Sequence, residues 1–124
     1  MVKLVFTLRR RPGTTREEFQ RYWRDQHAPL VKRHAETLRI RRYVQVHARE
    51  TELDDALTTP RGSEAGYDGV AELWWDSLED LIAGYSTESG QAAGAELLED
   101  ERRFIDLPHS PLWLGEENVV VGAP

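Results

Sequence analysis

A histidine lies on the apolar face of a predicted helix, close to a proline that interrupts the helix. Phe19, Trp23 and Leu30 recur at helical spacing, and His27 falls among them. Pro29 has no amide hydrogen and crowds the preceding turn, so we expect the helix to kink or restart there. A histidine that faces an apolar interior titrates near neutral pH and is a candidate general acid or base. The alternative is a core histidine bonded to a carbonyl freed by the kink.

The strand predicted after this helix carries further side chains suited to proton transfer. Tyr43, Gln45 and His47 alternate along it and therefore share one face of the sheet. If that face lines a pocket, Tyr43 can hydrogen-bond a developing enolate and the other two join the site; if it meets a partner subunit, they are interface residues. Packing alone also explains Tyr43 as a core aromatic residue with its hydroxyl at the surface. The predicted catalytic residues are His27, Tyr43 and His47.

A later strand offers candidate ligand contacts. Glu72 and Trp74 share one of its faces, where a carboxylate can orient a histidine and an indole can stack on an aromatic ligand. Trp23 is a candidate for the pocket wall, although core packing alone explains it. The predicted substrate-binding residues are Trp23, Gln45, Glu72 and Trp74.

The sequence contains no recognisable metal or cofactor motif. His27 and His34 are seven residues apart across the expected break, and the chain has no cysteine. A phosphate-binding loop, a dinucleotide-binding glycine motif and a Gly-x-Ser-x-Gly elbow are absent from the sequence. We therefore expect chemistry without metal or cofactor.

Length and charge restrict the class of protein. The 124 residues fit one domain, 1–124, and the net charge of -6 argues against nucleic acid as a partner. No run of 18 apolar residues and no signal-peptide pattern occurs, so we expect no membrane span and a cytoplasmic protein.

Hydrophobic periodicity and turn residues place the elements that must position these side chains. Strands are expected at residues 2–9, 40–49, 67–75 and 117–121. Helices are expected from residue 14 or 15 to about 26, from 29 onward, and from 77 to 105 with a break at 86–90. Residues 50–66 read as a long polar loop and 107–114 as irregular. Leu78, Leu81, Ile82 and Tyr85 mark an apolar helical face.

The order β-α-β-β-α-β predicts an α+β, ferredoxin-like fold: a four-stranded antiparallel sheet with helices on one face. The strands nevertheless carry apolar residues on both faces. An uncovered apolar sheet face of this size is unusual on a monomer, so we expect a homodimer with its two sheets face to face.

Several segments in this order resemble the EthD family of the dimeric α+β-barrel group. They span most of the chain and are RRPG at 10–13, EF at 18–19, YW at 22–23, HAPL at 27–30, YVQ at 43–45, YDGVAELW at 67–74, SLEDL at 77–81, DE at 100–101 and FID at 104–106. The chain departs from the family in residues 50–66 and 108–111, so a lid or pocket rim there is unpredictable.

The resemblance implies a homodimer with a pocket between sheet and helices in each protomer. Related isomerases implicate a histidine placed like His27 and a tyrosine placed like Tyr43. The resemblance also implies a hydrophobic, aromatic or polyketide-like substrate and cofactor-independent cyclisation, dehydration or isomerisation. Two alternatives stay open: a cofactor-free monooxygenase, and a non-catalytic ligand-binding or accessory protein.

Overall fold

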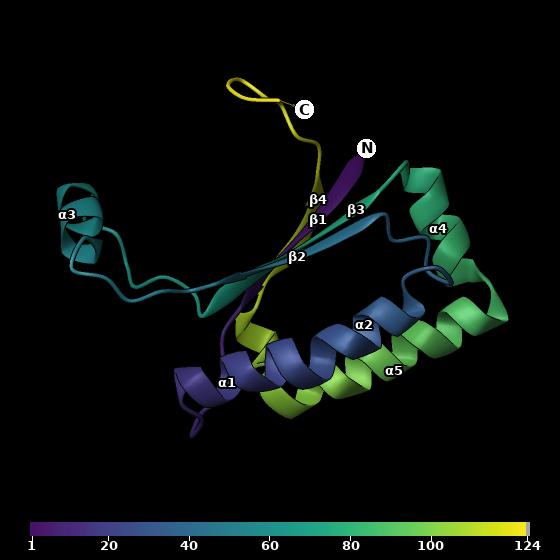
Figure 1. Cartoon of the computed structure of the whole chain (residues 1–124), viewed down its shortest axis with the longest axis horizontal. Helices are drawn as coiled ribbons and strands as arrows, with labels where there is room; N and C mark the ends of the chain where they lie inside the picture. Colours follow the sequence, from purple (N-terminus) through teal and green to yellow (C-terminus); the bar gives the residue numbers. More distant parts are fainter. Residues whose placement is uncertain (124) are drawn as a thin grey trace.

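The computed structural model describes residues 1–123 and is built around a four-stranded antiparallel sheet with strand order β2-β3-β1-β4 (Figure 1). The strands are β1 (Val2–Leu8), β2 (Arg42–His47), β3 (Gly69–Trp75) and β4 (Leu112–Gly115). The first and third strands are therefore central, and the predicted ferredoxin-like α+β fold is confirmed.

The first helical region is continuous and contains a widened turn. It comprises α1 (Arg16–Tyr22), the π-helical segment η1 (Trp23–His27) and α2 (Ala28–His34). Thr15 and Glu18 cap its start reciprocally. The expected break at Pro29 is wrong: the helix runs on because the Ala28 amide bonds the carbonyl five residues back, at Trp23. This wider turn relieves the crowding that a proline imposes on a regular α-helix.

The second helical region consists of α4 (Leu78–Ser86) and α5 (Glu88–Phe104), and the predicted break between them is confined to Thr87. The two helices meet closely: a Cβ on Gly90 would overlap the carbonyl oxygen of Gly84. The apolar helical face expected at residues 78–85 is only partly buried in α4. Leu78 and Ile82 are about half exposed, because only one side of this short helix packs against α5 and the sheet.

The long excursion after β2 has structure of its own. It contains α3 (Asp54–Thr58) and the 3-10 turn η2 (Thr59–Arg61), and no residue of either is buried. Figure 1 shows α3 held away from the rest of the molecule.

The C-terminal prediction is wrong in position. After the 3-10 turn η3 (Leu107–His109), strand β4 forms at Leu112–Gly115, and residues 117–121 form no strand. Thr7 bonds the carbonyl of Pro111 through both its amide and its hydroxyl, so the chain is already aligned with β1 at Pro111. A proline needs no amide bond at the start of an edge strand, which is why two nearby prolines did not prevent pairing.

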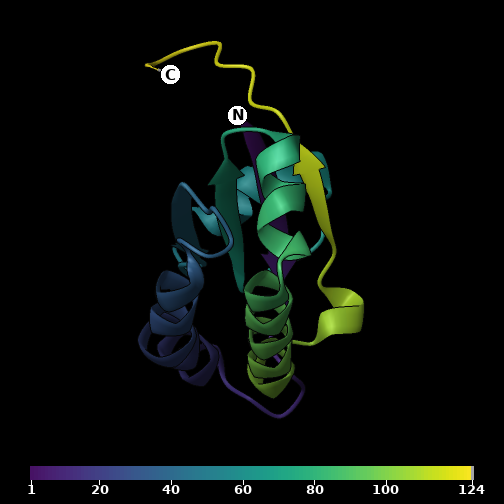
Figure 2. The ribbon, with the colours of Figure 1, turned by 90° about the vertical axis from the view of Figure 1, so that its right-hand side faces the viewer.

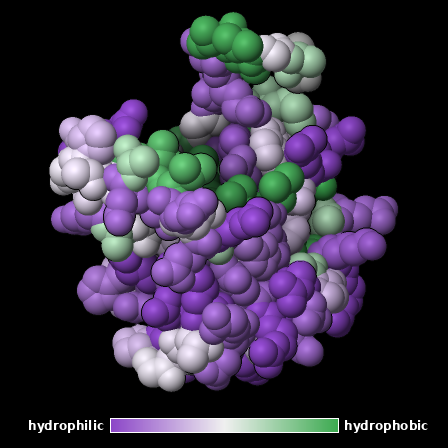
Figure 3. Space-filling view, turned by 60° about the vertical axis from the view of Figure 1, so that its left-hand side comes forward, coloured by the Kyte–Doolittle hydropathy of each residue, from purple (hydrophilic) through white to green (hydrophobic). Residues whose placement is uncertain are grey.

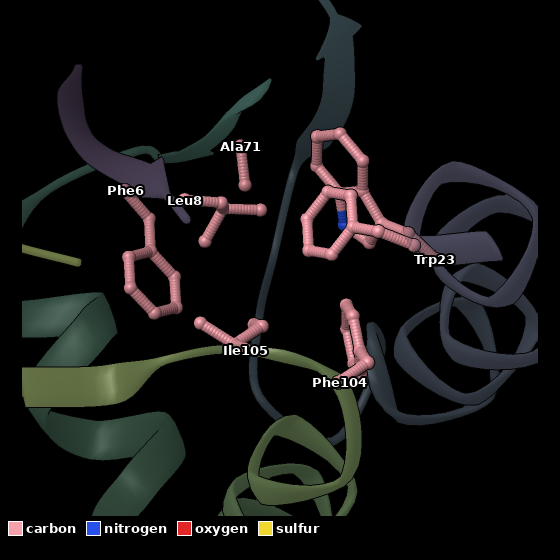
Figure 4. Packing of buried hydrophobic residues seen from close by; sticks show 7 residues of the cluster. Phe6, Leu8, Trp23, Ala71, Phe104 and Ile105 are labelled. Carbon is pink, nitrogen blue, oxygen red and sulfur yellow. The ribbon is translucent and has the colours of Figure 1, made fainter. Parts of the chain in front are cut away.

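The helices cover one face of the sheet. The first helical region and α5 lie side by side beneath it (Figures 1 and 2). In Figure 4, Phe6, Leu8 and Ala71 point from the strands toward Phe104 and Ile105, while Trp23 enters from the helical side. Because side chains alternate along a strand, the intervening residues of β1, β2 and β3 lie on the other, uncovered face.

Candidate functional site

The buried His27 forms a pair with a carboxylate from the last long helix. Its Nδ1 lies 2.7 Å from Oδ2 of Asp100 on α5, and both residues are buried. Since an ionised carboxylate only accepts hydrogen bonds, Nδ1 carries the hydrogen and donates it. The alternative of a histidine bonded to a freed carbonyl is therefore wrong, because the partner is a carboxylate 73 residues away in sequence.

Asp100 is ionised because three donors converge on it. Tyr22 donates to Oδ1 at 2.6 Å and Arg103 donates to the same oxygen at 2.9 Å. Burial alone would raise the pKa of Asp100, but the hydrogen bonds from Tyr22, His27 and Arg103 outweigh it and hold the pKa below its ordinary value. Asp100 is therefore a charged orienting group for the imidazole at neutral pH.

His27 is neutral for the opposite reason. Burial lowers its pKa below the ordinary histidine value, and the bond and charge of Asp100 oppose this shift without reversing it. Phe104 packs against the imidazole with ring centroids 5.0 Å apart. Among the described residues, none forms a hydrogen bond with Nε2, so this nitrogen has a lone pair available as a base.

An enclosed cavity of about 150 Å³ lies between the sheet and the helices, and His27 lines it. The apolar part of its wall comes from strands β1, β3 and β4 and from the helices beneath, with Phe6, Leu73, Leu112, Val31, Leu97 and Ile105 as representative members. Its polar members are His27, Tyr43, Tyr85 and Glu101. A small apolar chamber with a few convergent polar groups is the usual form of a ligand site.

The π-helical segment sets the position of His27. One extra residue in the turn offsets α2 from α1, and such turns recur at functional sites. Trp23, at the start of the segment, is held against the sheet at Gly69, where a Cβ would overlap the indole. Trp23 lines the same cavity as His27.

Strand β2 turns its predicted row of polar residues toward the helices. Gln45 donates from Nε2 to the Tyr43 hydroxyl at 2.9 Å and to the Trp23 carbonyl at 3.0 Å. Gln45 thus ties β2 to the π-helical segment. Tyr43 is partly buried, and this burial raises the pKa of its hydroxyl, so the phenol is a neutral hydrogen-bond donor at the cavity wall.

His47 lies apart from His27. Its Nε2 pairs with Oε1 of Gln45 at 2.8 Å, and its ring stacks on Trp23 with centroids 4.5 Å apart. It lines the open groove between α1 and residues 50–66 and does not line the enclosed cavity. The structure therefore brings His27 and Tyr43 together and leaves His47 on the far side of Trp23.

Glu72 and Trp74 lie on the uncovered face of the sheet, opposite His27. Lys3 forms an ion pair with Glu72 and packs over the Trp74 ring, with 4.6 Å between its nitrogen and the ring centroid. In the antiparallel register these side chains alternate with Leu73, which lines the cavity, so they cannot reach it. The sequence pattern showed that Glu72 and Trp74 share a face, but it could not say which face the helices cover.

Two residues of the cavity wall were not among the sequence candidates. Glu101 follows Asp100 on α5, and Tyr85 comes from α4. Burial raises the pKa of Glu101 to about 7; the charge of Asp100 adds to this and Arg102 opposes it. Burial also raises the pKa of Tyr85, with a further contribution from Glu101. Residues 96–103 are rich in charge and read as a solvated helix face, so only their position beneath the sheet distinguishes Asp100 and Glu101.

Residues 1–123 lack two features that would point to other classes of site. No group of three or more histidine, aspartate or glutamate side chains in this range is arranged to hold a metal ion. No helix in the same range is both long enough and apolar enough to cross a membrane.

The sheet order and the enclosed cavity define a ferredoxin-like α+β protein with a chamber between sheet and helices. The chain belongs to the EthD domain family, whose model matches residues 11–108. No curated protein matches it in sequence.

Solved structures share the fold. An EthD family protein from Bacillus halodurans is 22% identical, with 95% of this chain and 99% of that chain covered and a TM-score of 0.63. An EthD-like protein from Ralstonia eutropha is 20% identical, with 98% and 94% covered and a TM-score of 0.60. SnoaB, a cofactor-independent oxygenase from Streptomyces nogalater, is 12% identical, with 98% and 97% covered and a TM-score of 0.58. At these identities the likeness concerns the fold.

Proposed function

We propose that the protein is a cofactor-independent enzyme that moves a proton on a hydrophobic small molecule held in the cavity, with His27 as the general base. The observation that carries this proposal is the pairing of Asp100 with His27, which lines an apolar chamber. Asp100 fixes the tautomer that leaves Nε2 as an acceptor, and burial keeps the imidazole neutral. Removal of a proton from carbon beside a carbonyl is the chemistry such a base performs.

Tyr43 is the second member of the proposed site. Its hydroxyl lies at the cavity wall, and burial raises its pKa, so it keeps its proton at neutral pH. A neutral phenol donates a hydrogen bond to an oxygen on which negative charge develops, such as that of an enolate. Cyclisation, dehydration and isomerisation of aromatic or polyketide-like compounds all pass through such an enolate, and the site supports them without selecting one.

The size of the chamber limits the ligand. A cavity of about 150 Å³ accommodates one aromatic ring, while larger ligands commonly occupy 300 Å³ or more. Tyr43 also lines an open hollow of about 510 Å³ beside α2 and the edge of β2. A ligand with more than one ring would extend through this wall, so Tyr43 is the proposed point of entry.

The experiment that tests the proposal uses 2-indanone, a compact ketone with acidic C–H bonds. Binding is followed by chemical-shift changes in the protein, and catalysis by NMR detection of deuterium entering the ketone in D₂O. Binding with accelerated exchange supports the proposed enzyme. Binding without exchange supports the alternative of a ligand-binding or accessory protein, and the absence of both contradicts the proposal.

A cofactor-free oxygenase is the second candidate, favoured by the shared fold with SnoaB. Here His27 would make the substrate carbanion and dissolved O₂ would then add to it. Oxygen consumption in the presence of anthrone, whose carbanion reacts with O₂, identifies this activity. Proton exchange that is the same with and without O₂, with no oxygen consumed, excludes it.

We also propose that the protein works as a homodimer joined through the uncovered sheet face. This face carries apolar residues on every strand, including Val5, Val44, Val46, Val70, Trp74 and Trp113. Val46 and Trp113 are about half exposed, and Val120 and Val121 in the C-terminal tail are almost fully exposed. In Figure 3, hydrophobic side chains gather in the upper part of the molecule, above the hydrophilic outer surface of the helices. Two such faces packed together would bury this surface.

A further inference from the structure

We propose that Glu101 is a second catalytic residue, which donates a proton to the substrate oxygen while His27 takes one from carbon. This assignment rests on the proposed function and adds an acid to its base. Glu101 and His27 both line the enclosed cavity, from α5 and from the π-helical segment respectively. A carboxyl group and an imidazole on the wall of one small apolar chamber can act on the same ligand.

The placement of Glu101 on α5 separates its role from that of its neighbour. Asp100 is turned toward Tyr22, His27 and Arg103 and is fully engaged with them. Glu101 is one residue further along, about 100° around the helix, on the side that carries the cavity residues Leu97 and Ile105. Adjacent acids thus have different surroundings: one faces donors and is charged, the other faces an apolar chamber.

The Glu101 carboxyl group is not used to hold the structure together. Within residues 1–123 it accepts no hydrogen bond and forms no ion pair, whereas Glu96 and Glu99 on the same helix pair with His34 and Arg102. Most buried polar groups have such partners. Glu101 is partly buried and has no such partner within residues 1–123, so its carboxyl group is available to a ligand.

The surroundings of Glu101 favour its protonated form. Tyr43 from β2 and Tyr85 from α4 face the same cavity and offer no positive charge, and Asp100 adds a negative one. Arg102 is the opposing cation. With a pKa of about 7, close to half of the Glu101 side chains carry a proton at neutral pH, which suits a group that must both give and regain it.

The proposed step balances without any other reagent. His27 Nε2 takes a proton from carbon beside the carbonyl, and the C–H electron pair forms the C=C bond of an enol. The Glu101 O–H bond breaks and its proton passes to the carbonyl oxygen, leaving a carboxylate. In the reverse direction the carboxylate regains the enol proton, and the imidazolium returns a proton to the same or another carbon. No oxidant or reductant takes part.

The test compares wild type with Glu101→Gln in 2-indanone exchange from pH 5 to 9. We expect the wild-type rate to rise as His27 loses its proton and to fall above about pH 7 as Glu101 loses its own. Glutamine does not titrate and is a weaker donor, so E101Q is expected to lose the falling limb and about 10²-fold of the maximal rate. Glu96→Gln, an exposed position on the same helix, is the matched control and is expected to keep both.

A second measurement does not depend on turnover. The infrared carbonyl band of bound 2-indanone is expected to shift to lower frequency at pH 5.5, where Glu101 donates a hydrogen bond, and to lose this shift in E101Q and at pH 9. Full exchange rate, an unchanged falling limb and an unchanged carbonyl band in E101Q would overturn the role of Glu101 and leave the His27 proposal standing. A wild type that binds the ketone without exchanging it would instead contradict the proposed function, and with it the role of Glu101.

Discussion

The two faces of the sheet carry different kinds of residues. The face that the helices cover borders the cavity. The titratable groups around this cavity have shifted pKa values; they are His27, Tyr43 and Glu101. The uncovered face has valines, two tryptophans and the Lys3–Glu72 ion pair. Burial of titratable groups costs stability and is kept where chemistry uses it, whereas an exposed apolar surface is kept where another surface covers it. We therefore assign the proposed chemistry to the covered face and the proposed dimer contact to the uncovered face.

Removal of the proposed base, His27, is expected to have the largest effect on activity. His27→Ala is expected to lower the rate of deuterium exchange into 2-indanone about 10²–10⁴-fold, which is the range that one well-placed general base supplies. The matched control is His109→Ala. His109 forms a similar pair, with Nδ1 2.9 Å from Oδ2 of Asp106, but it is exposed in a turn outside the cavity. Equal loss in both variants, or no loss in H27A, would contradict the role of the covered face.

The assignment of the uncovered face to assembly is tested by a charge placed on that face. Val46→Asp places a carboxylate on exposed β2, and burial of two such charges in a symmetric interface is expected to weaken dimerisation about 10²-fold or more. Sedimentation at several protein concentrations measures this. Ile82→Asp is the control, since Ile82 is about as exposed but lies on α4. A wild type that sediments as a monomer, or dimers that resist V46D, would overturn the proposed interface.

The raised pKa of Glu101 makes the stability of the protein depend on pH. Because the pKa of Glu101 is about 7 in the folded protein, above its ordinary 4.5, the folded state binds this proton more tightly than the unfolded state. Stability is therefore lost as pH rises from about 4.5 to 7, by about 3 kcal/mol. Glu101→Gln removes this dependence, so the free energy of unfolding of E101Q should exceed that of wild type at pH 8 and approach it at pH 4.5. Urea unfolding at both pH values checks this, and an identical pH dependence would contradict the burial of Glu101.

Some residues of the covered face could be predicted from the sequence, and others could not. The order of most helices and strands was predictable, and so was the place of His27 on an apolar helical face, because hydrophobic periodicity and capping residues are local signals. Alternation along β2 placed Tyr43, Gln45 and His47 on one face but left open whether that face lines the pocket. Alternation also could not place Glu72 and Trp74 on the uncovered face, because it defines two faces without saying which one the helices cover. Asp100 was missed as a candidate because Tyr22 and His27 are distant from it in sequence. Glu101 was missed because the other walls of its cavity come from distant segments, and acids on a helix look solvated until the fold places them beneath a sheet.

The continuity of the first helical region also could not be predicted from the sequence. Proline at position 29 correctly indicated a disturbance of the regular helix, but the backbone met it with a π-helical turn. The difference matters for function, since a break would free the orientation of His27, whereas the π-helical turn keeps it within a continuous helix beside Phe104.

The smallest expected effect comes from removing the charge of Asp100 while keeping its shape. Asp100→Asn can still accept from His27 Nδ1, so the exchange rate is expected to fall only about 10–100-fold, as for other groups that orient a functional imidazole. The pH profile is the more telling readout. Asp100 raises the pKa of His27 and the pKa of Glu101 alike, so both limbs of the D100N profile should move to lower pH. Asp106→Asn, beside the exposed His109, controls for loss of an acid and should move neither limb. A D100N profile with a lower rate and unmoved limbs would mean that Asp100 acts only through packing. The charge of Asp100 would then not set the pKa values of His27 and Glu101 on the covered face.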